Sequence, residues 1–120
     1  MKGILIIGHG SREKSVERTL EAVVEMVQAK LPEKLFEIAY MALGQQTIPS
    51  GLTTLIEQGA GEITVVPYFL FNGIHLRKDI PEMIKAYQQA HPHVKIVMSR
   101  PLGADERLAA ILVDRIQECP

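Results

Sequence analysis

The chain has 120 residues, of which 47% are hydrophobic, so it fits one domain with a core large enough to fold without disulfide bonds. Its net charge of −1 and its 5% aromatic content exclude the basic, aromatic-rich surface that binds nucleic acid. The single cysteine, Cys119, excludes a disulfide framework and a CxxC metal site, and it favours a reducing, cytoplasmic location.

Short apolar runs alternate along the chain with amphipathic helical repeats. The first run, Lys2–Gly8, predicts a buried strand, and polar residues from His9 onward end it well before signal-peptide or membrane-span length. A helix follows, with Ser11 as its predicted cap and Pro32 as its stop. The other predicted elements are a strand at Leu35–Met41, a helix at Ile48–Gln58, a strand at Ile63–Leu70, a helix from Ile80 capped by Asp79, a strand at Val94–Met98 and a helix at Asp105–Glu118.

Strict alternation of strands and helices predicts an α/β fold, with a four-stranded parallel sheet between two helical layers in one domain, residues 1–120. The common strand order 2-1-3-4 reverses between the first and third strands, and open sheets bind ligands at that edge. His9 follows the first strand, and His75 lies in the loop after the third. We therefore expect these two histidines to share one crevice.

The turn Gly8–Arg12 has the sequence Gly-His-Gly-Ser-Arg, in which glycines allow a ligand to approach the backbone and the helix N-terminus attracts anions. It lacks the third glycine of a dinucleotide site and the Gly-Lys-Ser/Thr of a P-loop. A plain strand-to-helix turn explains the same residues. Neutral imidazole favours cobalt, nickel, iron or zinc over hard cations. His91 and His93 flank a proline in a polar connection and receive no role.

Several segments, in this order and spacing, resemble the small class II chelatases, the CbiX/SirB-type sirohydrochlorin cobaltochelatases and ferrochelatases. The resemblance spans essentially the whole chain. Its segments are Ile6–Arg12, Thr47–Pro49, Glu57–Ala60, Val65–Pro67, Gly73–His75, Asp79–Pro81 and Arg100–Asp105.

The resemblance implies a chelatase half-domain that forms a homodimer and inserts cobalt, iron or nickel into sirohydrochlorin, for siroheme or cobalamin synthesis. The divalent metal is then a substrate, and no cofactor is permanently bound. His9 would be the catalytic metal-binding residue and His75 the second metal ligand. Substrate contacts would come from Ser11, Arg12, Gln45, Leu70, Phe71, Asn72, Gly73, Ile74 and His75.

One departure from the family pattern stands out after the second strand. Relatives carry two glutamates there, whereas this chain has Ala42 and Gln45, so position 42 is either a lost ligand position or a packed strand residue. A non-catalytic metal or tetrapyrrole carrier is therefore an alternative function. Phosphoryl transfer through a phosphohistidine fits less well, because Gly8 stands where such enzymes place an arginine before the histidine.

Overall fold

The computed structural model describes residues 1–42, 46–71, 73–74 and 78–120. These residues form alternating strands and helices, as the sequence predicts. The elements are β1 (Lys2–Gly8), α1 (Lys14–Lys30), β2 (Leu35–Tyr40), α2 (Ile48–Glu57), β3 (Glu62–Pro67), α3 (Ile80–Ala90), β4 (Lys95–Met98) and α4 (Glu106–Gln117).

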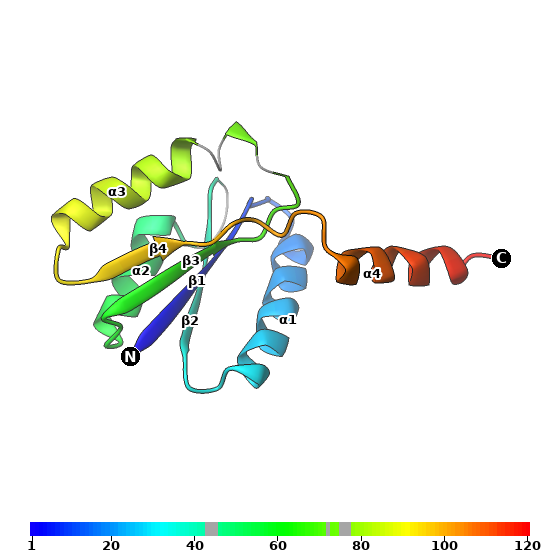
Figure 1. Cartoon of the computed structure of the whole chain (residues 1–120), viewed down its shortest axis with the longest axis horizontal. Coiled ribbons are helices and arrows are strands. Elements are labelled where there is room, and N and C mark those ends of the chain that lie inside the picture. The colour runs from blue at the N-terminus through cyan, green and yellow to red at the C-terminus, as the bar shows by residue number, and fades with distance from the viewer. Residues whose placement is uncertain (43–45, 72, 75–77) are drawn as a thin grey trace.

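The strands form one parallel sheet in the order β2-β1-β3-β4, which confirms the predicted topology (Figure 1). β1 is a central strand, and it pairs with β2 up to Gly8 and Tyr40 and with β3 up to Ile7 and Pro67. The carboxyl ends of these three strands therefore lie at one edge of the sheet. His9 leaves the sheet at this edge, where ligands bind in open parallel sheets.

Helices cover the two faces of the sheet unequally (Figure 1). α2 and α3 cover one face, over a continuous core that contains fully buried Leu5, Ile7, Leu55 and Ile63. α1 covers the other face through Leu20 and Val24, which form a smaller cluster with residues of β1 and β2. The fold is thus the predicted three-layer arrangement, with its larger core on the side of α2 and α3.

The predicted cap of α1 is wrong, and the predicted cap of α3 has the right position but makes no capping hydrogen bond. Ser11 Oγ accepts a hydrogen bond from the N–H of Glu13 (3.1 Å), but Glu13 itself is the N-cap of α1, so Ser11 stabilises the preceding turn. Asp79 occupies the N-cap position of α3, but its backbone is helical and its side chain makes no capping hydrogen bond. A cap requires an extended residue before the first helical one.

The last helix, α4, leaves both layers. It begins after Asp105, whose carboxylate accepts from the N–H of Arg107 (2.9 Å) and from its guanidinium. These hydrogen bonds to Arg107 hold the pKa of Asp105 well below its usual value. No residue of α4 is buried, and the helix projects from the rest of the molecule, so that the whole chain extends over 55 Å (Figure 1). Among the described helices, none has the length and apolar character needed to cross a membrane.

The close contact of α2 with the sheet depends on Gly51. A Cβ at this position would lie 2.6 Å from Leu5 Cδ1, and Leu5 is fully buried. We expect overpacking in Gly51→Ala to lower the free energy of unfolding by about 1–3 kcal/mol. The higher helix propensity of alanine should offset up to about 1 kcal/mol of this loss. Urea unfolding measures the change. Gly61→Ala is the control, because a Cβ there meets no atom within 4 Å, and equal effects at the two sites would contradict the packing argument.

Candidate functional site

Backbone hydrogen bonds continue the sheet beyond the strand ends on both sides of His9. The N–H of Ala42 donates to the carbonyl of His9 (3.3 Å). On the other side, the N–H of Tyr68 donates to the carbonyl of Ile7 (2.8 Å). His9 is therefore flanked by the segments that follow β2 and β3, although its own side chain is exposed.

The turn after His9 depends on a glycine. Gly10 has φ +97°, a conformation that L side chains rarely adopt, and it turns the chain from β1 towards α1. Ser11 is partly buried in this turn, and Arg12 is exposed. The turn thus presents a cation and the start of a helix close in sequence to the histidine, which suits an anionic ligand.

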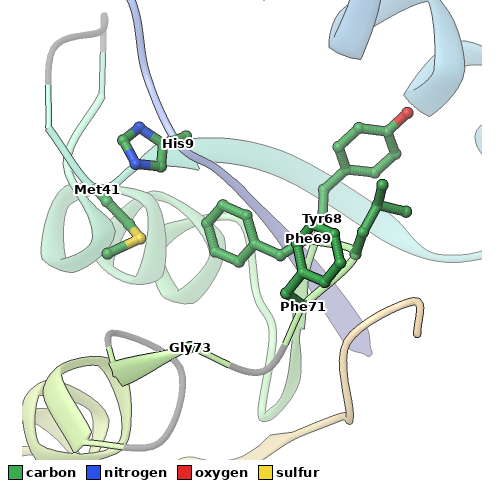
Figure 2. Close-up of a pocket in the computed structure, with 7 residues that line it drawn as sticks. His9, Met41, Tyr68, Phe69, Phe71 and Gly73 are labelled. Atoms are coloured by element: carbon green, nitrogen blue, oxygen red, sulfur yellow. The ribbon is translucent and has the colours of Figure 1, made fainter.

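A pocket of about 360 Å³ opens beside His9 (Figure 2). Aromatic and aliphatic side chains form most of its wall, and the rings of His9 and Phe69 meet edge to face with centroids 6.1 Å apart. Phe71 is 80% exposed, so the outer part of this wall is open to solvent. The lining residues are His9, Met41, Tyr68, Phe69, Leu70, Phe71 and Gly73.

A second hollow of about 260 Å³ shares His9 and Met41 with the first. Ala42 and Asp79 also line it. Ala42 is the position at which the sequence departs from the family pattern, and Asp79 places a carboxylate-bearing residue at the start of α3. Across the described part of the chain, no group of three or more His, Cys, Asp or Glu residues could hold a metal ion. Among the described residues that line these two hollows, His9 and Asp79 are the ones that belong to these four types.

Tyr40 lies at the same edge but on the face covered by α1. Burial, together with the negative charges of Glu17 and Glu21, raises the pKa of Tyr40 above its usual value. Its hydroxyl therefore stays protonated at neutral pH and is a poor candidate for a base. Glu17 is itself buried, and its Oε1 lacks a hydrogen-bond partner within the described structure.

The structure brings part of the predicted site together. Leu70, Phe71 and Gly73 line the pocket with His9, whereas Ile74 is exposed and outside this lining. Ser11 and Arg12 lie in the turn after β1. The predicted positions Gln45, Asn72 and His75 lie outside the described residues.

Sequence reasoning missed Met41, Tyr68 and Phe69 as pocket residues. One signal was present, since an aromatic pair directly follows Pro67, the last residue of β3. β3 ends at Pro67, which has no N–H to donate, and beyond the hydrogen bond from the Tyr68 N–H to the Ile7 carbonyl the apolar run predicted to be strand up to Leu70 leaves β1. These residues form the pocket wall because the strand ends earlier than the hydrophobic pattern does.

A histidine and an apolar wall at the carboxyl edge of a parallel sheet define a ligand-binding protein of the open α/β class. The chain belongs to the CbiX family, because the family model described as CbiX matches residues 3–119.

Three known proteins illustrate the similarity. The sirohydrochlorin ferrochelatase of Priestia megaterium is 36% identical over 98% of this chain and 44% of its own length. The sirohydrochlorin cobaltochelatase of Methanopyrus kandleri is 30% identical over 98% of this chain and 96% of its own length. The crystal structure of SirB from Bacillus subtilis subspecies spizizenii in complex with cobalt superposes with a TM-score of 0.90 at 32% identity, over 98% of this chain and 50% of SirB. The chain thus spans about half the length of some relatives and nearly all of another.

Proposed function

We propose that this chain is one lobe of a sirohydrochlorin chelatase, which inserts divalent cobalt, iron or nickel into the tetrapyrrole. The observation that carries the proposal is the position of His9, at the switch point of the sheet and beside an apolar, aromatic pocket. The names of the ferrochelatase and cobaltochelatase relatives and the cobalt complex of SirB support it. Residues 1–120 act as a single domain, and the cytoplasmic location remains a prediction.

The chemistry requires two events at one place. The metal ion must lose water as it binds the four ring nitrogens, and the two N–H protons of the macrocycle must leave to bases. A neutral imidazole both ligates such metals and accepts a proton near neutral pH, so His9 holds the metal and takes a proton. His75 would be the second metal ligand.

The pocket wall suits the substrate. One face of a flat, largely apolar ring can stack against Phe69, Leu70 and Phe71, which lie just beyond the end of β3. The peripheral carboxylates of the ring need cations and N–H donors, and Arg12 at the end of the turn is exposed and available for this role. Gln45, Asn72 and Ile74 are further proposed contacts.

The direct test follows the absorbance of sirohydrochlorin with purified protein and cobalt, iron or nickel in turn. We expect each equivalent of protein to convert more than one equivalent of sirohydrochlorin, because a catalyst turns over. A change that stops at one equivalent would identify a carrier instead, and no change with any of the three metals would contradict the proposal.

Asp79 gives the proposal a further test. Asp79 lines the hollow beside His9, so we expect its negative charge to favour the approach of a divalent cation. Asp79→Asn should raise the KM for metal by roughly tenfold, equivalent to about 1.4 kcal/mol, with little change in kcat. Steady-state rates over a range of cobalt concentrations measure this split. Glu82→Gln in the first turn of α3 is the control, and the prediction fails if both variants behave alike.

A further inference from the structure

β2 lies at the edge of the described sheet, with β1 on one side only. At the carboxyl end of its outer side, Gln46 takes the place of a neighbouring strand. The N–H of Tyr40 donates to the carbonyl of Gln46 (2.8 Å), and Nε2 of the Gln46 side chain donates to the carbonyl of Ile38 (2.9 Å). The last three residues of β2 are therefore held from both sides, by β1 on the inside and by Gln46 on the outside.

The half-buried Gln46 side chain uses both ends of its amide. Nε2 also donates to Oε1 of Glu37 (3.0 Å), while the amide oxygen accepts from the hydroxyls of Thr54 (3.2 Å) and Ser50 (3.4 Å) on α2. An amide has two N–H donors and two acceptor lone pairs, and all four are used here. Gln46 therefore joins the outer side of β2 to α2.

Three residues that are close to Gln46 in sequence line the smaller hollow beside His9. Met41 and Ala42 directly follow the held end of β2, and Ile48 begins α2 two residues after Gln46. Met41 also lines the larger pocket, where the macrocycle is proposed to bind. The hydrogen bonds of Gln46 thus hold the strand end and the helix start that carry this wall.

Burial holds the members of this wall unequally. Ile48 is 2% exposed and belongs to the main core, whereas Met41 is half-buried and Ala42 is exposed. A segment with few buried contacts opens locally at a low cost in free energy, so its order depends more on hydrogen bonds than on packing. For Met41 and Ala42, the hydrogen bonds at issue are their own to the end of β1 and those of Gln46 to the end of β2.

We propose that Gln46 is a positioning residue, which keeps Met41 and Ala42 ordered beside His9 before the substrate binds. When a site is formed in only a fraction of the molecules, the apparent affinity falls by that fraction. Loss of the Gln46 side chain should therefore raise the KM for sirohydrochlorin and leave kcat nearly unchanged, because His9 follows the central strand β1. This kinetic consequence rests on the proposed chelatase function, whereas the ordering itself does not.

Amide hydrogen exchange of the full chain tests the ordering without any ligand. In Gln46→Ala, the N–H groups of Met41 and Ala42 should exchange about tenfold faster than in the wild type, because the hydrogen bonds beside them are lost. Gln28→Ala is the matched control, since Gln28 lines the same surface groove as Gln46 but its side chain makes no hydrogen bond to a described residue. Unchanged exchange in Gln46→Ala, or equal acceleration in both variants, would overturn the positioning role.

Steady-state kinetics test the consequence for binding. Gln46→Ala should raise the KM for sirohydrochlorin roughly tenfold with kcat within about twofold of the wild type, and Gln28→Ala should change neither. An unchanged KM in Gln46→Ala would overturn the link between the ordered wall and the substrate. A wild type that inserts no metal would contradict the chelatase function, and hydrogen exchange would still decide whether Gln46 orders the wall.

Gln46→Glu tests the Nε2 donor specifically, because its hydrogen bonding depends on pH. A protonated carboxyl group can donate to the carbonyl of Ile38 in place of the amide, whereas an ionised one has no donor and lies beside the carboxylate of Glu37. The other ionisable groups that line the groove around Gln46 are Glu21, Glu25 and Tyr40. The glutamates favour the protonated form of the introduced carboxyl group, so its pKa should lie above the usual value for glutamate.

The KM of Gln46→Glu, divided by that of the wild type at the same pH, should be close to one at about pH 5 and approach the value for Gln46→Ala by about pH 8. Gln28→Glu adds the same charge to the groove and should keep a ratio of one throughout. A ratio for Gln46→Glu that does not change with pH would overturn the role of the donor. If Gln46→Ala does not fold, this pH profile and the exchange protection of Gln46→Glu at the two pH values decide the question.

Discussion

Replacing His9 with alanine is expected to abolish metal insertion into sirohydrochlorin. The imidazole is proposed both to ligate the metal and to accept a ring proton, and loss of a general base alone typically lowers a rate by about 10²- to 10⁴-fold. Because the His9 side chain is exposed and contributes to neither hydrophobic core, the variant should fold normally. The absorbance assay, run beside a thermal melt, measures both properties.

The matched control is His93→Ala, which removes an exposed imidazole from the connection between α3 and β4. It should insert metal at the wild-type rate. His75→Ala should lower the rate strongly while leaving residual activity, as expected for a second ligand. Wild-type rates in both the His9 and the His75 variants would show that neither histidine handles the metal.

The sequence was sufficient to predict the topology because short, mostly apolar runs alternate with amphipathic helical repeats. The 2-1-3-4 order then placed His9 at the switch point without any three-dimensional information. Helix ends were harder to predict. Ser11 and Asp79 are both good capping residues by type, but capping depends on where the backbone becomes helical. The N-cap of α1 lies two residues after Ser11, and Asp79 is at the N-cap position of α3 with a backbone that is already helical.

The pocket wall and the exposed position of α4 could not be predicted from the sequence, for a different reason. Tyr68 and Phe69 continue an apolar run, so only the end of β3 at Pro67 shows that they leave the sheet. The apolar stripe of α4 has the same periodicity as that of a helix packed on its own sheet. Periodicity indicates that a helix has an apolar face, but it does not indicate which surface, if any, covers that face.

The missing glutamate after β2 leads to the prediction most particular to this sequence. Ala42 borders the hollow beside His9, and its N–H donates to the His9 carbonyl, so a longer side chain at this position starts next to the proposed metal ligand. Ala42 is also exposed. It is therefore not a packed strand residue, and a carboxylate there would keep its hydration instead of becoming a buried, unpaired charge.

Ala42→Glu is accordingly expected to bind cobalt about tenfold more tightly than the wild type, equivalent to about 1.4 kcal/mol, because it adds an oxygen ligand beside the imidazole. The melting temperature should change little. Calorimetric titration with cobalt, together with thermal melts, measures both quantities. Ala42→Gln is the control, since it has the same length without the charge and should bind cobalt nearly as the wild type does. Unchanged affinity in Ala42→Glu together with a lowered melting temperature would place residue 42 outside the metal site.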